Sequence, residues 1–150
     1  MTEILATTVD KFTFRVPTDR FYDEEGLWVR LGEEGIVSIG LGDFLQQSSG
    51  DVAFADVKPA GAVLLVGQPF ASIETIKATL ELESPVPGAV VKVNPAVAAR
   101  PEVINQDPYG DGWLARVRVR DWETVRTRLL DPGRYFVLMK GRAEEEAGKA

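Results

Sequence analysis

Cysteine and histidine are both absent from this chain of 150 residues. Without cysteine there can be no disulfide framework, no zinc–thiolate site and no cysteine nucleophile. Without histidine the chain lacks the commonest general base and metal ligand, which argues against a self-sufficient hydrolase. Neither of the glycine-rich motifs that bind phosphate groups occurs, so the sequence offers no nucleotide site.

The chain also lacks long apolar runs and an excess of basic residues. Its net charge is −6 and its pI is near 4.8, which disfavours nucleic acids and anionic membranes as partners. No window approaches the length of a membrane span. Residues 1–20 contain Glu3, Asp10 and Asp19, so they resemble neither a secretory signal nor an acid-poor transit peptide. We therefore expect a cytoplasmic protein.

The length fits one domain that can bury a stable hydrophobic core without disulfides or bound metal ions. We expect residues 1–20 to form an N-terminal extension and residues 21–140 to form the folded domain. Residues 141–150 are charged and rich in alanine, glutamate and glycine, which predicts a flexible tail.

One stretch, residues 73–80, organises the rest of the chain. It places Lys77 between two short runs of alternating apolar and polar residues, the period of a half-buried strand. Lys77 is therefore predicted to lie at the tip of a hairpin. A solvated turn lysine has no special role in most proteins, but a lysine at an exposed corner also suits covalent attachment of a swinging arm.

A short repeat flanks this hairpin. Residues 61–67 (GAVLLVG) are similar to residues 88–94 (GAVVKVN), which lie 27 residues later in the chain. Each copy reads as a glycine turn, a β-branched strand and a residue that tolerates positive φ. Two similar strand units around a hairpin predict a small, mainly β sandwich with pseudo-two-fold symmetry.

The remaining pattern predicts three more strand regions and a few short helices. The strand regions are a hairpin over 27–31 and 35–40, a strand over 52–57 and a strand over 113–120. The helices are expected after an Asp43 N-cap, after Asn94 with Pro95 in the first turn, and over 122–130 after an Asp121 cap. We expect Asp131, Pro132 and Gly133 to stop the last of these, and residues 134–140 to add one short element.

Four ordered motifs resemble the glycine cleavage system H protein family. Glu74-Thr75-Ile76-Lys77-Ala78, followed by Ser84-Pro85-Val86-Pro87-Gly88, is similar to that family's lipoyl-lysine motif. The family's segments before and after it are matched by 40–47 with 50–52, by 101–105 and by 107–113 (DPYGDGW), which we expect to form a rigid turn that buries Tyr109 and Trp113. The resemblance runs from about Tyr22 to about Leu138.

The resemblance implies a barrel-sandwich hybrid fold of the lipoyl/biotinyl type with a C-terminal helix. It implies a non-catalytic, monomeric carrier with lipoate in amide linkage on Lys77, and Glu74 would help a modifying enzyme or partner recognise the hairpin. The implied partners are a lipoate ligase or a lipoyl or octanoyl transferase, a pyridoxal-phosphate glycine decarboxylase, an aminomethyltransferase and a dihydrolipoamide dehydrogenase.

Three positions depart from the family pattern and leave alternatives open. Gly26 stands where the family usually has histidine, and Leu80 and Glu83 replace its usual serine and tyrosine. These changes leave two alternative functions open. One is a paralogous lipoate-binding protein that carries sulfur intermediates in a heterodisulfide-reductase-like system; the other is a binding or regulatory module that never receives lipoate. Lipoyl domains of 2-oxoacid dehydrogenases fit less well, because the chain lacks their linker and catalytic domain.

Overall fold

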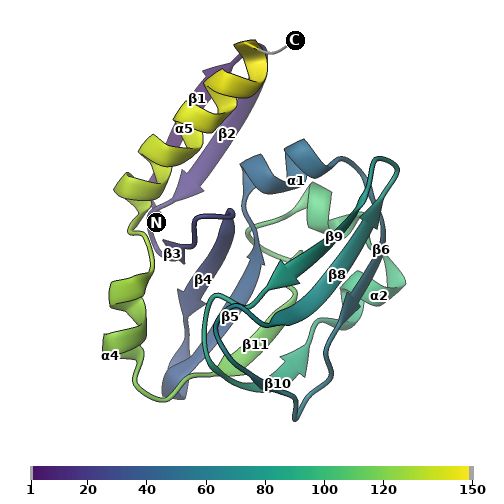
Figure 1. Cartoon of the computed structure of the whole chain (residues 1–150), viewed down its shortest axis with the longest axis vertical. Helices are drawn as coiled ribbons and strands as arrows, with labels where there is room; N and C mark the ends of the chain where they lie inside the picture. The colour runs from purple at the N-terminus through teal and green to yellow at the C-terminus, as the bar shows by residue number, and fades with distance from the viewer. Residues whose placement is uncertain (1, 149–150) are drawn as a thin grey trace.

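Alternating apolar and polar residues fold the middle of the chain into two antiparallel sheets (Figure 1). The structure is a computed structural model and describes residues 2–148. The larger sheet has six strands, which in spatial order are β3 (Phe21–Tyr22), β4 (Leu27–Leu31), β5 (Ile36–Leu41), β11 (Ala115–Arg118), β10 (Gly88–Val93) and β7 (Val63–Leu64). The smaller sheet contains β6 (Val52–Val57), β8 (Pro69–Thr75) and β9 (Thr79–Glu83).

The inward-facing residues of both sheets meet in one hydrophobic core. Val37, Ile39 and Val117 from the larger sheet and Phe70 and Ile73 from the smaller sheet are all buried in this cluster. Burying apolar side chains between two sheets is the main stabilising contribution in such a sandwich. The predicted fold class, a mainly β barrel-sandwich hybrid with a C-terminal helix, is confirmed.

The two copies of the repeat pair with each other. Leu64 lies opposite Gly88 and Val63 opposite Ala89 in antiparallel register. The second copy is a full strand, whereas the first is ordered as a strand over only two residues. Gly67 has a φ of 85° as expected, but Asn94 has a φ of −70° because it caps a helix. The two copies are thus neighbouring strands of one sheet, a pairing that the repeat alone did not predict.

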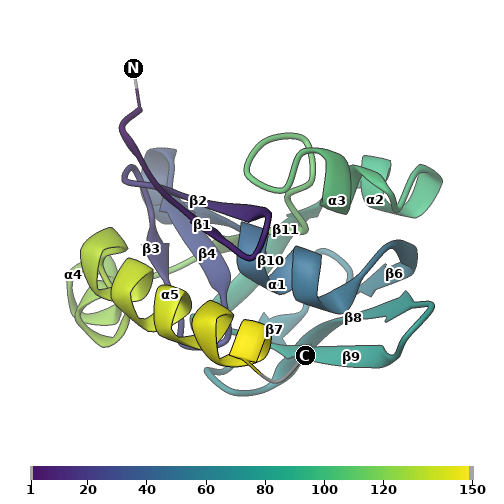
Figure 2. The ribbon, with the colours of Figure 1, turned by 90° about the horizontal axis from the view of Figure 1, so that it is seen from above.

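A second, smaller core lies outside the sandwich. The hairpin of β1 (Ile4–Val9) and β2 (Phe12–Pro17) packs against helix α5 (Pro132–Gly148), and Figures 1 and 2 show the two running side by side. The buried members of this cluster include Phe14, Tyr22, Trp28, Tyr135 and Met139. The rings of Tyr22 and Tyr135 are stacked with their centroids 4.5 Å apart. The first and last segments of the chain thus stabilise each other.

The C-terminal part of the chain differs most from the sequence prediction. Pro132 begins α5 instead of stopping a helix, and α5 continues through residues 134–140 and 141–148. Asp131 accepts a hydrogen bond from the Arg134 backbone N–H at 2.8 Å, as a capping residue does. Residues 141–148 of the tail expected over 141–150 form the end of α5, where Ala143 is buried, and residues 149 and 150 lie outside the described residues. The division of the chain at residues 20 and 140 stays a prediction.

The other helices are short, and most begin where predicted. They are α1 (Asp43–Ser49), α2 (Pro95–Ala99), α3 (Val103–Gln106) and α4 (Trp122–Val125), with 3-10 turns at η1 (Glu33–Gly35) and η2 (Arg126–Arg128). Asn94 and Asp121 cap α2 and α4 as expected. The Asp43 prediction is wrong, because Gly42 holds the cap position and the Asp43 carboxylate instead accepts from the Arg15 backbone N–H at 2.9 Å. None of the helices in residues 2–148 has the length and apolar character needed to cross a bilayer.

Candidate functional site

The β8–β9 hairpin holds Lys77 in its connecting loop, as predicted. Glu74 pairs with Thr79 as the last pair of the ladder, and Ile76, Lys77 and Ala78 form the loop between the strands. The Thr75 backbone N–H donates to the Ala78 carbonyl at 2.9 Å and closes the turn. The same two strands place Ile73 in the core, so the base of the hairpin is fixed in the sandwich.

The hydroxyl of Thr75 organises the loop itself. It accepts from the backbone N–H groups of Lys77 and Ala78, each at 3.2 Å, and lies 3.2 Å from the Ala78 carbonyl, to which it donates. A threonine side chain that bonds to backbone groups two and three residues onward is a common turn-stabilising device. The loop that carries Lys77 is therefore a defined turn and not an irregular connection.

Lys77 is exposed, and its side chain extends over the end of α1. Its Cδ and Cε lie within 3.8 Å of the point where a Cβ on Gly50 would stand. Within residues 2–148, no carboxylate lies within ion-pair distance of its amine. Lys77 also lines an open groove of about 450 Å³ together with Phe12, Phe14, Gln47, Ser48 and Glu146. The amine is accessible and has a partly apolar surface beside it.

The end of α1 is anchored next to the hairpin by Asn105. Its side-chain amide donates to the Gln46 side chain at 3.1 Å and to the Gly50 carbonyl at 3.0 Å, and its oxygen accepts from the Val52 backbone N–H at 2.9 Å. Gly50 has a φ of 88° and a ψ of −172°, a conformation that only glycine adopts without strain. These contacts fix the floor on which the Lys77 side chain lies.

The segment 107–113 forms the rigid turn that its sequence predicts. The Asp107 carboxylate accepts from the Asp111 backbone N–H at 2.8 Å, and the Trp28 indole N–H donates to the Pro108 carbonyl at 2.9 Å. The Tyr109 hydroxyl accepts from the Asp43 backbone N–H at 2.9 Å and donates to the Arg15 carbonyl. Tyr109 and Trp113 are partly buried. The turn therefore joins β2, α1 and the sandwich.

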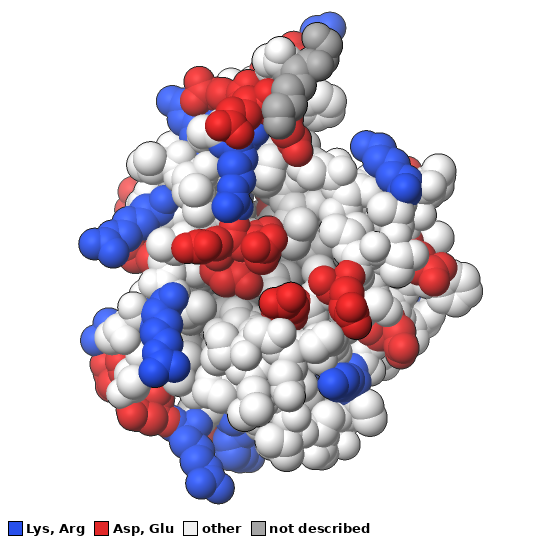
Figure 3. All heavy atoms as spheres, viewed as in Figure 1, with Lys and Arg blue, Asp and Glu red and all other residues white. Residues whose placement is uncertain are grey.

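Glu74 lies on the outer face of the smaller sheet, close in sequence to the loop. It is exposed, as are Glu81 and Glu83 on the neighbouring strand. Figure 3 shows acidic side chains gathered across the middle of the face that carries β8 and β9. Glu74 is therefore available to a partner that approaches Lys77, although the structure assigns it no contact that sets it apart from the other two.

Gly26, where the resemblance leads us to expect histidine, lies in a crowded part of the second core. A Cβ at this position would lie 3.1 Å from both the Leu45 Cβ and the Tyr135 hydroxyl oxygen, and the φ of Gly26 is 103°. A larger side chain would need α5 and α1 to shift. The glycine is thus matched to the way α5 packs in this chain.

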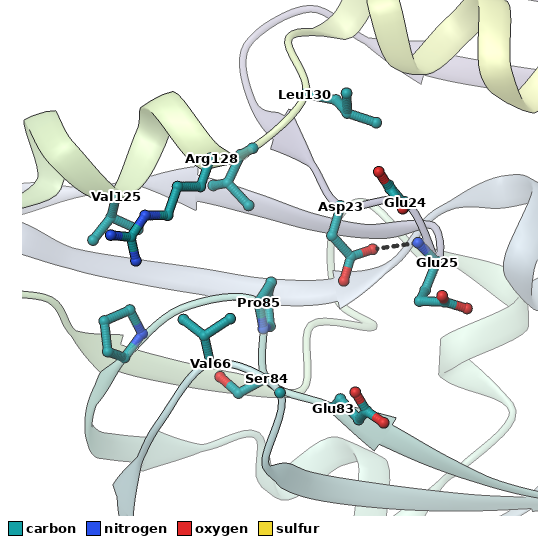
Figure 4. Close-up of a pocket in the computed structure, with 13 residues that line it drawn as sticks. Asp23, Glu24, Glu25, Val66, Glu83, Ser84, Pro85, Val125, Arg128 and Leu130 are labelled. Carbon is teal, nitrogen blue, oxygen red and sulfur yellow. Dashed lines mark hydrogen bonds between the residues drawn. The ribbon is translucent and has the colours of Figure 1, made fainter.

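A separate pocket of about 280 Å³ lies at the other end of β9 (Figure 4). Asp23, Glu24, Glu25 and Glu83 line it together with Arg128. Burial raises the pKa of Asp23 to about 6, although its carboxylate accepts backbone hydrogen bonds that lower the pKa. Residues 2–148 contain no group of three acidic side chains placed to hold a metal ion.

The sequence predicted Lys77 and its hairpin but missed three neighbours. Ile76 follows the alternating pattern of a strand, yet it lies in the loop and is 90% exposed. Phe12 and Phe14 lie in the N-terminal extension, for which no element was predicted, although the alternation of apolar residues from 12 to 16 is a strand signal. These aromatic residues reach the Lys77 groove only through tertiary packing.

Comparisons with known proteins point to one family. The model of the family described as glycine cleavage H-protein matches residues 20–142. The glycine cleavage system H protein of Chlorobium limicola is 38% identical over 83% of this chain and 97% of that protein, and the one from Beutenbergia cavernae is 40% identical over 84% and 98%. The crystal structure of a glycine cleavage system H protein from Mycobacterium marinum superimposes with a TM-score of 0.73, at 29% identity, and the match covers 80% of this chain and 95% of that one.

Proposed function

Because the chain belongs to the glycine cleavage H-protein family, we propose that it is a lipoyl carrier with lipoate in amide linkage on Lys77. The observation that carries this proposal is the position of the amine. Lys77 is exposed in a three-residue loop at the end of a hairpin whose base is buried. A modifying enzyme can reach this amine, and a rigid scaffold holds the point of attachment.

The chain's own contribution to attachment is to present a nucleophile. The nitrogen of Lys77 attacks the carbonyl of an activated lipoyl group, such as the acyl adenylate formed with ATP, held by the modifying enzyme. The amide bond forms as the bond from that carbonyl to the activating group breaks, and a proton and the activating group are released. Within residues 2–148, no carboxylate pairs with the amine. The amine therefore does not have to leave a carboxylate of the described residues before it enters the site of the modifying enzyme.

The bound dithiolane would supply reversible disulfide chemistry, and the protein would supply position. Tethering a reactive group raises its local concentration at each docked active site. In the glycine cleavage cycle that the family implies, the docking enzymes are a pyridoxal-phosphate glycine decarboxylase, an aminomethyltransferase and a dihydrolipoamide dehydrogenase. The net charge of −6 suits docking to basic surfaces on such enzymes.

We assign Glu74 a role in recognition of the hairpin by the modifying enzyme. Its exposed carboxylate lies three residues before Lys77 on the same hairpin. Glu81 is also exposed on the adjacent strand, and it provides a matched control of the same charge. Replacing Glu74 with glutamine should slow attachment, whereas Glu81→Gln should leave the rate unchanged.

Attachment is tested by intact mass spectrometry after incubation with a lipoate ligase, ATP and lipoate. We expect one adduct, located on Lys77 by peptide mapping. Lys77→Arg should remove the adduct, whereas Lys58→Arg, at another exposed lysine, should not. If the wild type gains no adduct while a control H protein is modified, the chain is an unmodified binding or regulatory module.

The cargo is tested separately from attachment. The lipoylated protein should support exchange of bicarbonate into the carboxyl group of glycine by a glycine decarboxylase. A protein that is fully lipoylated but does not support this exchange would instead fit the sulfur-carrying paralogue. The family match and the relatives' names favour the aminomethyl carrier.

A further inference from the structure

The two edges of the N-terminal hairpin have different surroundings. β2 contacts α1, and Figure 1 shows β1 on the side of β2 that faces away from α1. α5 covers one face of the hairpin, where Leu5 and Val9 pack with Tyr135 and Met139. Within residues 2–148, α5 makes no hydrogen bond to β1, so it covers the face of the strand and leaves the backbone groups of its edge unpaired.

The register of the hairpin determines which backbone groups of β1 point outward. The Thr18 backbone N–H donates to the Glu3 carbonyl at 2.9 Å, and this pair continues the register in which Leu5 lies opposite Val16. Opposite residues of an antiparallel pair alternate between hydrogen-bonded and non-hydrogen-bonded pairs. Leu5 therefore bonds to β2, and the free edge of β1 consists of the outward N–H and C=O groups of Ile4, Ala6 and Thr8.

Side chains close the corresponding edge of β2 but not the free edge of β1. The Gln47 side chain donates to the Thr13 carbonyl at 2.9 Å. The Asp43 carboxylate accepts from the Arg15 backbone N–H at 2.9 Å. Among residues 2–148 no partner of this kind meets the backbone groups of the free edge. An unpaired row of N–H and C=O groups is a template for one more strand.

The sequence of β1 lacks the features that usually protect an exposed edge. Natural proteins place charges, prolines or β-bulges on such strands. Residues 4–9 (ILATTV) contain no charged residue and no proline, and β1 pairs with β2 without a bulge. Across residues 2–17 the charges cancel, because the acidic pair Glu3 and Asp10 is matched by the basic pair Lys11 and Arg15. The hairpin is thus locally neutral in a chain whose net charge is −6.

We propose that the free edge of β1 pairs with β1 of a second copy of this chain, so that two hairpins form one continuous antiparallel sheet. A second copy fits because its own β1 presents the same unpaired groups, and a two-fold axis brings two identical strands together in antiparallel orientation. The local neutrality removes the repulsion that the net charge would otherwise cause. β1 lies outside residues 20–142, the part that the family model matches, so this association belongs to the N-terminal extension of this chain.

Charge complementarity selects the register of the new pair. Pairing centred on Thr7 places Glu3 opposite Lys11 of the second copy, and the two-fold axis repeats this pair at the other end. The same register places Leu5 opposite Val9 of the second copy, on the face that α5 covers. Opposite charges and apolar side chains in such positions both stabilise a sheet.

The pairing leaves the attachment site free. In this register the outward backbone groups of Ala6 bond to those of Thr8 in the second copy. Neither residue lines the groove beside Lys77. The dimer therefore presents two accessible lysines, a consequence that rests on the proposed function, and it binds a partner that also has two sites more tightly than a monomer does.

The test measures self-association of the full chain by sedimentation velocity from about 1 to about 500 µM, a range that covers weak pairing. We expect a reversible monomer–dimer equilibrium, with slower amide hydrogen exchange at Ala6 and Thr8 as the concentration rises. Ala6→Lys should weaken the association about tenfold, because a charge on an edge strand opposes pairing. Ala53→Lys is the matched control, since Ala53 is also an exposed alanine in an edge strand, β6, and gains the same charge.

The register has a test of its own. Lys11→Glu places like charges opposite each other and should weaken the dimer, whereas Glu3→Lys combined with Lys11→Glu should restore it. A Tm equal to that of the wild type would show that each variant is still folded. Association of Lys11→Glu at the wild-type strength would mean that the register centred on Thr7 is wrong.

The outcomes separate this proposal from the proposed function. A wild type that stays monomeric over the whole range would refute pairing with a second copy. A dimer that Ala6→Lys and Ala53→Lys weaken equally, or one without protection at Ala6 and Thr8, would refute the assignment to β1. Failure of Lys77 to acquire lipoate would overturn the proposed function but not the dimer, because the pairing of β1 does not need the adduct.

Discussion

Replacing Thr75 with valine tests whether the Lys77 loop must be ordered to be modified. The change keeps the shape of the side chain and removes a hydroxyl that accepts from the Lys77 and Ala78 backbone N–H groups at 3.2 Å. A net hydrogen bond contributes about 0.5–1.5 kcal/mol, and water can replace the bonds of an exposed loop. We therefore expect a loss of about 1 kcal/mol in loop order, or about fivefold in the equilibrium constant.

The assay is the specificity constant for lipoylation by a lipoate ligase, measured by intact mass. Thr75→Val should lower it by about fivefold while Tm falls by no more than about 4 °C, because the change is local. Thr75→Ser, which keeps the hydroxyl, should restore most of the rate. Thr79→Val is the control, since Thr79 is exposed on the other side of the loop and its hydroxyl has no hydrogen-bond partner within residues 2–148. If Thr79→Val slows modification as much as Thr75→Val, the proposed role of the Thr75 hydroxyl is wrong.

Three further predictions concern stability. Burial raises the pKa of Asp23 to about 6 in the folded protein, so its contribution to stability is present below pH 4 and is lost as the pH rises through 6. Asp23→Asn keeps an Oδ1 that accepts the backbone hydrogen bonds, and it should remove this part of the pH dependence of Tm. Gly40→Ala would place a Cβ 2.6 Å from the Trp28 ring and should cost about 1–3 kcal/mol in chemical denaturation. Met139→Ala should cost about 2–5 kcal/mol because the side chain is 1% exposed, and an unchanged denaturation midpoint would show that α5 does not stabilise the domain.

Sequence patterns correctly predicted the strands, turns and caps that are determined by residues close together in the chain. The alternation around Lys77, the Asn94 cap before Pro95 and the hairpin over β4 and β5 all depend on residues near one another in the chain, and each forms as expected. The candidate lysine was found for the same reason, since a turn between two short strands is a local feature.

The features that sequence reasoning missed depend on contacts between distant segments. Asp43 has the side chain of a typical N-cap, but its carboxylate accepts a hydrogen bond from the backbone N–H of Arg15, which lies 28 residues earlier in β2. Asp131 and Pro132 can end one helix or begin the next, and only the apolar spacing of Tyr135, Met139 and Ala143 indicates the second choice. The groove wall was not predictable, because no local pattern places β2 beside Lys77.

The Tyr109 hydroxyl has a consequence for the order in which the chain assembles. One oxygen atom joins the Arg15 carbonyl to the Asp43 backbone, and the hairpin that contains Arg15 also packs on α5, which lies far along the chain. The contacts of this hairpin with α1 can form early, whereas its contacts with α5 need a segment that is made much later. We expect the N-terminal hairpin to complete its docking last, on a sandwich that is already folded, so that the surroundings of Lys77 are completed after the sandwich itself.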